Sequence, residues 1–158
     1  MGNMLELMNI QMNMMAERAR QEIRVCNEVS CKFGLTLSEE AVGRLVESRA
    51  NALKDTGRIE FEGGILPKLI YALCDSPYIN QDNYEKTLAE LQQLFYSYKT
   101  EVETKYTDDE VIECIVKVFN GRANGSVDYI IGVDFEELKR RMLEDRDMYG
   151  TWKAGDDS

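Results

Sequence analysis

The sequence contains no histidine. Histidine is the side chain most often used near neutral pH as a base, a metal ligand or a partner to a nucleophilic serine or cysteine. Its absence excludes catalysis of the serine-histidine and cysteine-histidine kinds, and it excludes the Glu-x-x-His pairs of di-iron helical bundles. The nucleotide-binding patterns G-x-x-x-x-G-K-[ST] and G-x-G-x-x-G do not occur either. We therefore predict no catalytic residue, no cofactor and no metal site.

Proline, paired cysteines and long hydrophobic runs are also scarce. Two prolines in 158 residues are too few for a linker-rich chain. The four cysteines form no Cys-x-x-Cys pair and fall in apolar, helix-like stretches, which favours buried free thiols over a zinc or redox site. The apolar runs are shorter than the ~20 residues that cross a bilayer, and the opening residues lack a basic segment and a cleavage site. We predict a cytoplasmic protein.

Basic residues are outnumbered, with 19 Lys and Arg against 29 Asp and Glu, which leaves a net charge of −10. A strongly acidic protein repels nucleic-acid phosphates and anionic lipid surfaces at long range. We therefore expect no nucleic-acid partner and no membrane partner.

The apolar residues recur at the three- and four-residue spacing of helix faces. This pattern covers residues 4–32, 38–57, 66–74, 80–102, 107–121 and 135–147. Between the second and third segments, residues 58–62 alternate between apolar and charged and predict a short extended connection. The fold class predicted is all-α, an irregular bundle or array of five to seven helices with short connections. One helical domain is expected over residues 1–148, followed by a polar tail at 149–158.

Capping residues support several of these boundaries. Ser38 is a good N-cap for the second helix, and Thr107 with Glu110 forms the pattern of a capping box for the fifth. Gly34 and Gly57 follow the first and second helices, where a glycine can adopt the left-handed conformation that ends a helix.

Four stretches of the chain together resemble an uncharacterised family of small helical bacterial proteins. These stretches are Leu45–Arg49, Ala52–Phe61, Asp75–Ile79 and Phe119–Arg122. The resemblance covers about residues 36–141. It implies bacterial origin and small size, and it implies no activity, cofactor or catalytic residue, because the family has none assigned.

Methionines are concentrated in the first predicted helix, which holds six of the eight in the chain. Four of them share one helix face and form the candidate interaction face: Met4, Met8, Met12 and Met15. Unbranched, polarizable methionine side chains can repack against differing surfaces. This face either packs on the protein's own bundle or contacts a second copy or another protein. Because Ile10 and Met14 point elsewhere, the helix over 1–33 is apolar around much of its first half and can pack outside the main bundle.

A second candidate site is a polar ligand loop near the glycines that end the second helix. Its members are Asp55, Arg58, Glu60 and Glu62. The competing interpretation is structural: Glu60 and Glu62 share one side of an extended segment and face water, while Arg58 pairs with Asp55. Exposed ion pairs of this kind are common and weak, so we favour the structural interpretation.

The leading functional hypothesis is a non-enzymatic interaction or regulatory protein that self-associates, as a homodimer, through its methionine-rich first helix. The alternative is a small-molecule or metal-dependent helical enzyme whose carboxylates converge from separate helices, which a linear sequence does not reveal. A methionine ridge facing solvent would favour the first hypothesis. A cleft with three or more acids around Arg58 would favour the second.

Overall fold

The computed structural model describes residues 2–60 and 64–144, and over these residues the fold is entirely helical, with no strand. The elements are α1 (Gly2–Ser30), a 3-10 turn (Cys31–Phe33), α2 (Glu39–Thr56), α3 (Leu66–Leu73), α4 (Tyr84–Val102), α5 (Asp108–Asn120) and a last helix over residues 135–144. The all-α prediction is confirmed. Met1, Glu62 and the predicted tail at 149–158 lie outside the described residues.

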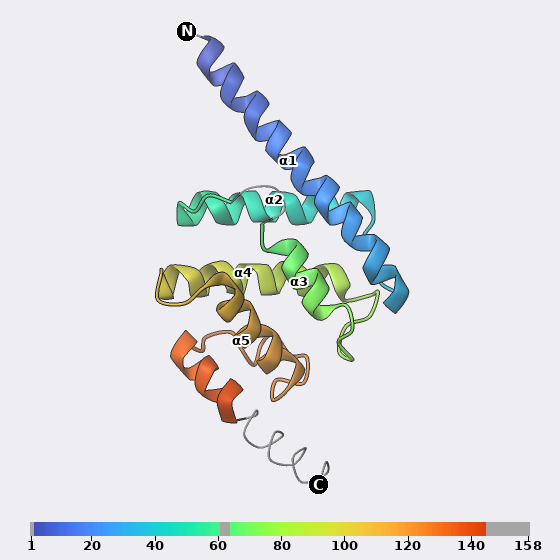
Figure 1. Cartoon of the computed structure of the whole chain (residues 1–158), viewed down its shortest axis with the longest axis vertical. Helices are drawn as coiled ribbons and strands as arrows, with labels where there is room; N and C mark the ends of the chain where they lie inside the picture. Colours follow the sequence, from blue (N-terminus) through green and yellow to red (C-terminus); the bar gives the residue numbers. More distant parts are fainter. Residues whose placement is uncertain (1, 61–63, 145–158) are drawn as a thin grey trace.

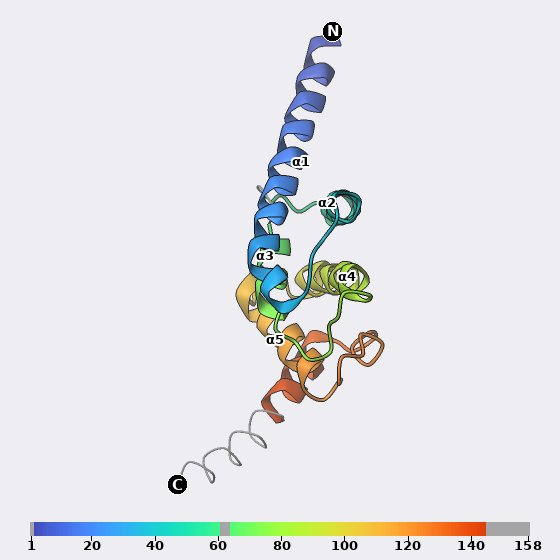
Figure 2. The same ribbon diagram turned by 90° about the vertical axis from the view of Figure 1, so that its right-hand side faces the viewer.

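The helices form two layers. Helices α2 and α4 contact each other and are seen nearly end-on in Figure 2, with α1, α3 and α5 on one side of them. Figure 1 shows the same array from the front, with α1 at one end and the 135–144 helix at the other. The buried hydrophobic side chains of all these helices form one cluster. No described helix has both the length and the apolarity that a membrane crossing requires.

The predicted caps mark the observed boundaries. The Ser38 hydroxyl accepts a hydrogen bond from the Ala41 backbone N–H at 3.1 Å, and Thr107 and Glu110 cap each other's backbone N–H groups. Helix α2 ends at Gly57 with φ +67°, the left-handed conformation that glycine adopts readily. The fourth helix begins later than predicted, with Asn83 as its N-cap residue, because residues 81–83 form a turn.

Helix α1 has two halves in different surroundings. Ala19, Ile23 and Cys26 are buried against α2 and α3, so the second half belongs to the core. The first half, residues 2–16, extends beyond the point where α1 crosses α2 and projects from the body of the protein (Figure 1). We call these residues the projecting segment.

Candidate functional site

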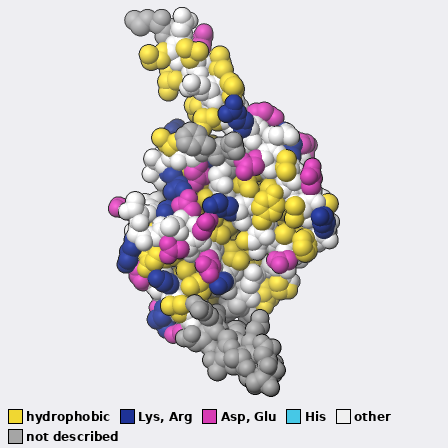
Figure 3. Space-filling view, viewed as in Figure 1, with side chains coloured by type: hydrophobic (Ala, Val, Ile, Leu, Met, Phe, Trp, Pro, Cys, Tyr) yellow, Lys and Arg dark blue, Asp and Glu magenta, His cyan; other side chains and the backbone are white. Residues whose placement is uncertain are grey.

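The candidate interaction face lies on the projecting half of α1 and is open to solvent. Met4 is 73% exposed, Met12 is 64% exposed and Met15, nearest the body, is 39% exposed. Leu7, Ile10 and Met14 on the other sides of the helix are exposed as well. Figure 3 shows hydrophobic side chains along the length of this segment, with polar and backbone atoms between them. Monomeric proteins seldom leave this many large apolar side chains exposed in one segment.

The projecting segment is helical because of its local sequence. It holds no proline, and after Gly2 no glycine occurs before Gly34. Methionine, leucine and glutamine are good helix formers, so the segment extends the helix that the buried second half anchors.

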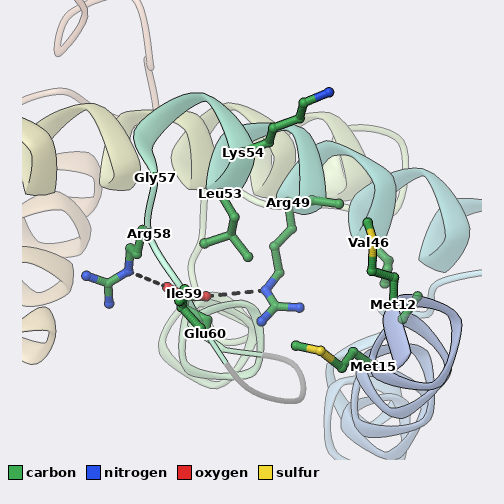
Figure 4. Close-up of a pocket in the computed structure, with 12 residues that line it drawn as sticks. Met12, Met15, Val46, Arg49, Leu53, Lys54, Gly57, Arg58, Ile59 and Glu60 are labelled. Atoms are coloured by element: carbon green, nitrogen blue, oxygen red, sulfur yellow. Dashed lines mark hydrogen bonds and ion pairs between the residues drawn. The ribbon is translucent and has the colours of Figure 1, made fainter. Parts of the chain in front are cut away.

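A groove of about 380 Å³ separates the base of the projecting segment from the C-terminal half of α2. Met12 and Met15 form one wall, as Figure 4 shows. Val46 and Leu53 of α2 line the other side, and Ile59 of the following connection closes one end. The lining is mostly apolar, with charged groups on the side nearest the connection.

Glu60 lies beside this groove and is buried, being only 8% exposed. Its Oε1 accepts hydrogen bonds from the Tyr96 hydroxyl at 2.6 Å and from Arg49 Nε at 3.3 Å. Its Oε2 accepts from Arg58 Nε at 2.8 Å. The prediction that Glu60 faces water is therefore wrong: the 58–60 connection folds back under α2, where two guanidinium groups neutralise the carboxylate.

The network continues from Arg58 to the start of α5. Arg58 Nη2 donates to Asp108 Oδ2 at 2.5 Å, and Lys99 Nζ lies 3.1 Å from Asp108 Oδ1. The Arg58 guanidinium also stands over the Phe95 ring, 5.6 Å from its centroid. The predicted Arg58–Asp55 pair is thus replaced by pairs with Glu60 and Asp108. We call Arg49, Arg58, Glu60, Tyr96, Lys99 and Asp108 the ion cluster.

Burial and charge set the proton affinities in this cluster. Burial raises the pKa of Tyr96, and its hydrogen bond to the Glu60 carboxylate raises it further, so Tyr96 remains a neutral donor. Burial acts to lower the pKa of Arg58, but Glu60 and Asp108 outweigh it and the pKa is raised. Tyr96 and Arg58 therefore keep their protons and remain donors to Glu60.

Gly64 makes the close packing around Glu60 possible. Its φ of +60° is a conformation that residues with a side chain rarely adopt. A Cβ at this position would lie 2.0 Å from Glu60 Oε1 and 3.0 Å from Arg49 Nε. Only glycine fits here without displacing the carboxylate.

One donor in the cluster has no acceptor. Arg49 is 6% exposed, and its Nη2 is a buried atom without a hydrogen-bond partner. Buried donors of this kind are uncommon and costly. In Figure 4 the guanidinium lies between Glu60 and the Met15 side chain.

The predicted polar loop is brought together only in part. Asp55 is exposed and forms no ion pair with any described residue, whereas Arg58 and Glu60 are at the centre of the cluster. Two carboxylates, those of Glu60 and Asp108, meet at Arg58. Within residues 2–60 and 64–144, no three His, Cys, Asp or Glu side chains are placed to hold a metal ion.

A comparison with family models finds one family that matches most of the chain. Residues 22–148 match the model of a family of unknown function, DUF6323. The chain belongs to this family. No curated protein and no solved structure matches it.

The DUF6323 match includes one of the two candidate sites and leaves out the other. The ion cluster lies inside the matched residues, and so does the core half of α1 from Glu22 onward. The projecting segment precedes them. The resemblance stated for residues 36–141 is confirmed as a match to a family of unknown function, over a longer range than expected.

Sequence reasoning missed four members of the cluster: Arg49, Tyr96, Lys99 and Asp108. One signal was available. Arg49 occupies the helix face of Val42, Leu45 and Val46, all of which are buried. An arginine on an otherwise apolar face indicates either a gap in that face or a buried charge with a partner. Nothing in the linear sequence pointed to Asp108 as a distant partner of Arg58.

Proposed function

We propose that this protein is a non-enzymatic interaction protein that self-associates by pairing the projecting segment of α1 with that of a second copy. The observation that carries the proposal is the exposure of the candidate interaction face, Met4, Met8, Met12 and Met15, on a helix that the body does not cover. Burying such side chains stabilises an assembly by about 1.5–3 kcal/mol for each one fully removed from water.

The spacing on this helix supports an antiparallel pair. Leu5, Met8, Met12 and Met15 follow one another at intervals of three, four and three, the a and d positions of a coiled coil. In an antiparallel pair an a residue faces a d residue. A two-fold axis level with Ile10 places Met8 opposite the second copy's Met12, and Leu5 opposite its Met15. The face is then complementary to itself, as a two-fold interface requires.

The charge distribution supports the same orientation. Residues 2–16 carry a single charged side chain, Glu6, so nearly all of the net charge of −10 lies elsewhere. A parallel pair would set the two acidic bodies side by side. In the antiparallel pair the two Ala16 residues are separated by about 18 Å along the helix axis, more than the screening length of ~8 Å in physiological salt.

We also propose the cytoplasm as the compartment. Support comes from the cysteines: all four are free, and three of them are buried. Proteins that keep unpaired thiols are typical of reducing compartments.

Truncation tests the proposal. Removing residues 2–16 is expected to convert a dimer to a monomer in multi-angle light scattering, while leaving the thermal unfolding midpoint of the body unchanged. The removed residues make few contacts with the core, so the helical circular dichroism should fall only by their own contribution. A full-length chain that is monomeric up to ~100 μM would contradict self-association.

A matched pair of substitutions separates the face from the helix as a whole. Met12→Lys places a charge on the face, and Asn13→Lys places the same charge on the next residue, about 100° around the helix. We expect Met12→Lys to weaken dimerisation at least tenfold in sedimentation equilibrium and Asn13→Lys to weaken it much less. Equal effects of Met12→Lys and Asn13→Lys would mean that added charge, rather than loss of this face, weakens dimerisation.

Cysteine cross-linking tests the orientation. The exposed Cys31 is first replaced by serine, and the Met8→Cys and Met12→Cys proteins are then mixed and oxidised. An antiparallel pair brings unlike cysteines within the ~4.4–6.8 Å Cα separation of a disulfide, so mass spectrometry should find mainly the mixed dimer. Mainly Met8→Cys homodimers would show a parallel pair, which changes the orientation but retains self-association.

A further inference from the structure

We infer that the groove between α1 and α2 binds a small amphiphilic carboxylate, whose head group accepts a hydrogen bond from Arg49 and whose apolar tail lies along Met12, Met15 and Leu53. This inference goes beyond self-association and does not depend on it. It rests on an unused donor, on the charges of the ion cluster and on the lining of the groove.

The unused donor is Arg49 Nη2. The guanidinium is more than nine-tenths buried and Arg49 lines the groove. Among residues 2–60 and 64–144 its one hydrogen-bond acceptor is Glu60, which Nε reaches at the long distance of 3.3 Å. A buried donor without a partner destabilises the fold. An acceptor that enters the groove would remove this cost.

The charges of the cluster favour an anionic acceptor. Among the described residues the cluster holds three cations, Arg49, Arg58 and Lys99, against the carboxylates of Glu60 and Asp108. Glu60 already accepts three hydrogen bonds. Arg49 therefore shares its one described carboxylate partner with Arg58 and Tyr96, and its buried guanidinium has a donor left for an incoming anion.

The size and lining of the groove define the rest of the ligand. At ~30 Å³ for each water-sized group, the 380 Å³ volume holds about a dozen non-hydrogen atoms. The Met12 and Met15 side chains are flexible and can shape themselves around an aliphatic chain. A single carboxylate matches the one unpaired donor, Arg49 Nη2, whereas a phosphate would bring three acceptor oxygens and a charge of about −1.5 to −2. A saturated acid of about ten carbons meets these conditions.

Decanoate is the probe for this site. Calorimetric titration of the full-length protein with decanoate below its micelle concentration is expected to show saturable binding of one decanoate per chain. Decanol lacks the charge and acetate lacks the tail, so each should bind at least tenfold more weakly. In NMR spectra the Arg49 Nε–H resonance should shift on titration. Equal affinity for decanol and decanoate would overturn the assignment of Arg49 as the head-group site.

Substitutions at the groove locate the ligand, and those at Ala50 and Asn51 lie outside the ion cluster. Ala50 is exposed and lines the groove, while its neighbour Asn51 is exposed but does not line it. Ala50→Phe should fill the groove and reduce decanoate affinity at least tenfold, and Asn51→Phe should leave it unchanged. Arg49→Lys keeps the charge beside Glu60 but removes the second nitrogen, and it should reduce affinity similarly.

Two results would overturn the inference. The first is unchanged decanoate binding in Ala50→Phe, which would place the ligand elsewhere. The second concerns Glu62, which lies outside the described residues and is close in sequence to the cluster. Tighter binding of decanoate by Glu62→Gln than by the parent protein would mean that this carboxylate already occupies the donor of Arg49.

Discussion

The projecting half of α1 and the ion cluster lie on two sides of one groove, and each departs from the usual distribution of side chains. In the first region large apolar side chains are exposed to water. In the second, the charged pair of Arg49 and Glu60 is buried, and Arg58, Lys99 and Asp108 lie partly exposed beside it. The apolar region has no partner among the described residues. The charged region supplies its own partners from α2, α4 and α5.

This difference shows which kind of departure points outside the molecule. An exposed apolar helix gains stability only when something covers it, so it indicates an external partner. A buried carboxylate with three donors is satisfied internally, so its first role is structural. The one point where the cluster remains incomplete, Arg49 Nη2, is also where it adjoins the groove.

The largest expected effect comes from Glu60→Gln. It leaves Arg49 and Arg58 enclosed without their shared anion, and breaking a buried pair in this way costs about 3–5 kcal/mol. For a domain of this size the thermal midpoint should fall by about 10 °C, which calorimetry or circular dichroism measures. The sequence alone predicted that Glu60 faces water, which would have made its contribution to stability small.

Asp55→Asn is the control for that substitution. Asp55 is exposed and belonged to the same predicted loop, so its replacement should change stability by no more than ~0.5 kcal/mol. If Asp55→Asn and Glu60→Gln had similar effects, the cluster would be no more than a set of weak surface pairs.

The next effect compares the two halves of α1. Ile23 is fully buried, and Ile23→Ala should cost about 2–5 kcal/mol of unfolding free energy. Met8→Ala removes a side chain of similar size from the projecting half and should change monomer stability by less than ~0.5 kcal/mol. Urea denaturation at sub-micromolar protein measures both, since dilution removes the contribution of dimerisation. A large loss in Met8→Ala would mean that the projecting half packs on the body.

Most of the fold followed from local sequence because helix periodicity and caps are local properties. Ser38, Gly57 and the Thr107–Glu110 box each act within one turn of the residue they serve. Six predicted helical segments therefore have observed counterparts among the described residues. The start of α4 was predicted at residue 80, but Asn80 and Asn83 each accept a hydrogen bond from the other's backbone N–H, which holds residues 80–83 in a turn before the helix.

The candidate site was less predictable because its contacts join residues far apart in the chain. Glu60 meets Tyr96 across 36 residues, and Arg58 meets Asp108 across 50. Local pattern gave Arg58 and Glu60 as neighbours but could not tell whether the connection faces water. The sequence pattern did reveal the candidate interaction face, because methionines are concentrated in the first helix.

A smaller effect is expected from Gly64→Ala, compared with Gly57→Ala. Both glycines have positive φ, +60° and +67°, so both substitutions carry the backbone strain of about 1 kcal/mol. Only at Gly64 does the added Cβ meet Glu60, whereas space at Gly57 is open. Gly64→Ala should therefore lose about 1–2 kcal/mol more than Gly57→Ala in denaturant titrations. Equal losses would show that the Glu60 side chain moves aside freely.

The smallest effect is expected at the exposed pair of Arg44 and Glu85, which joins α2 to α4 through two hydrogen bonds of 2.7 and 2.8 Å. A double-mutant cycle with Arg44→Gln and Glu85→Gln should give only a small coupling, because water screens both groups. The hydrogen bond from Arg44 lowers the pKa of Glu85 below 4.5, so the coupling is present above pH 4.5 and is lost as the pH falls through the folded pKa. It should also shrink in 1 M salt, where the screening length is ~3 Å. The Glu60 pairs are enclosed, so salt should affect their contribution much less, and equal salt sensitivity at the two sites would contradict the burial of the ion cluster.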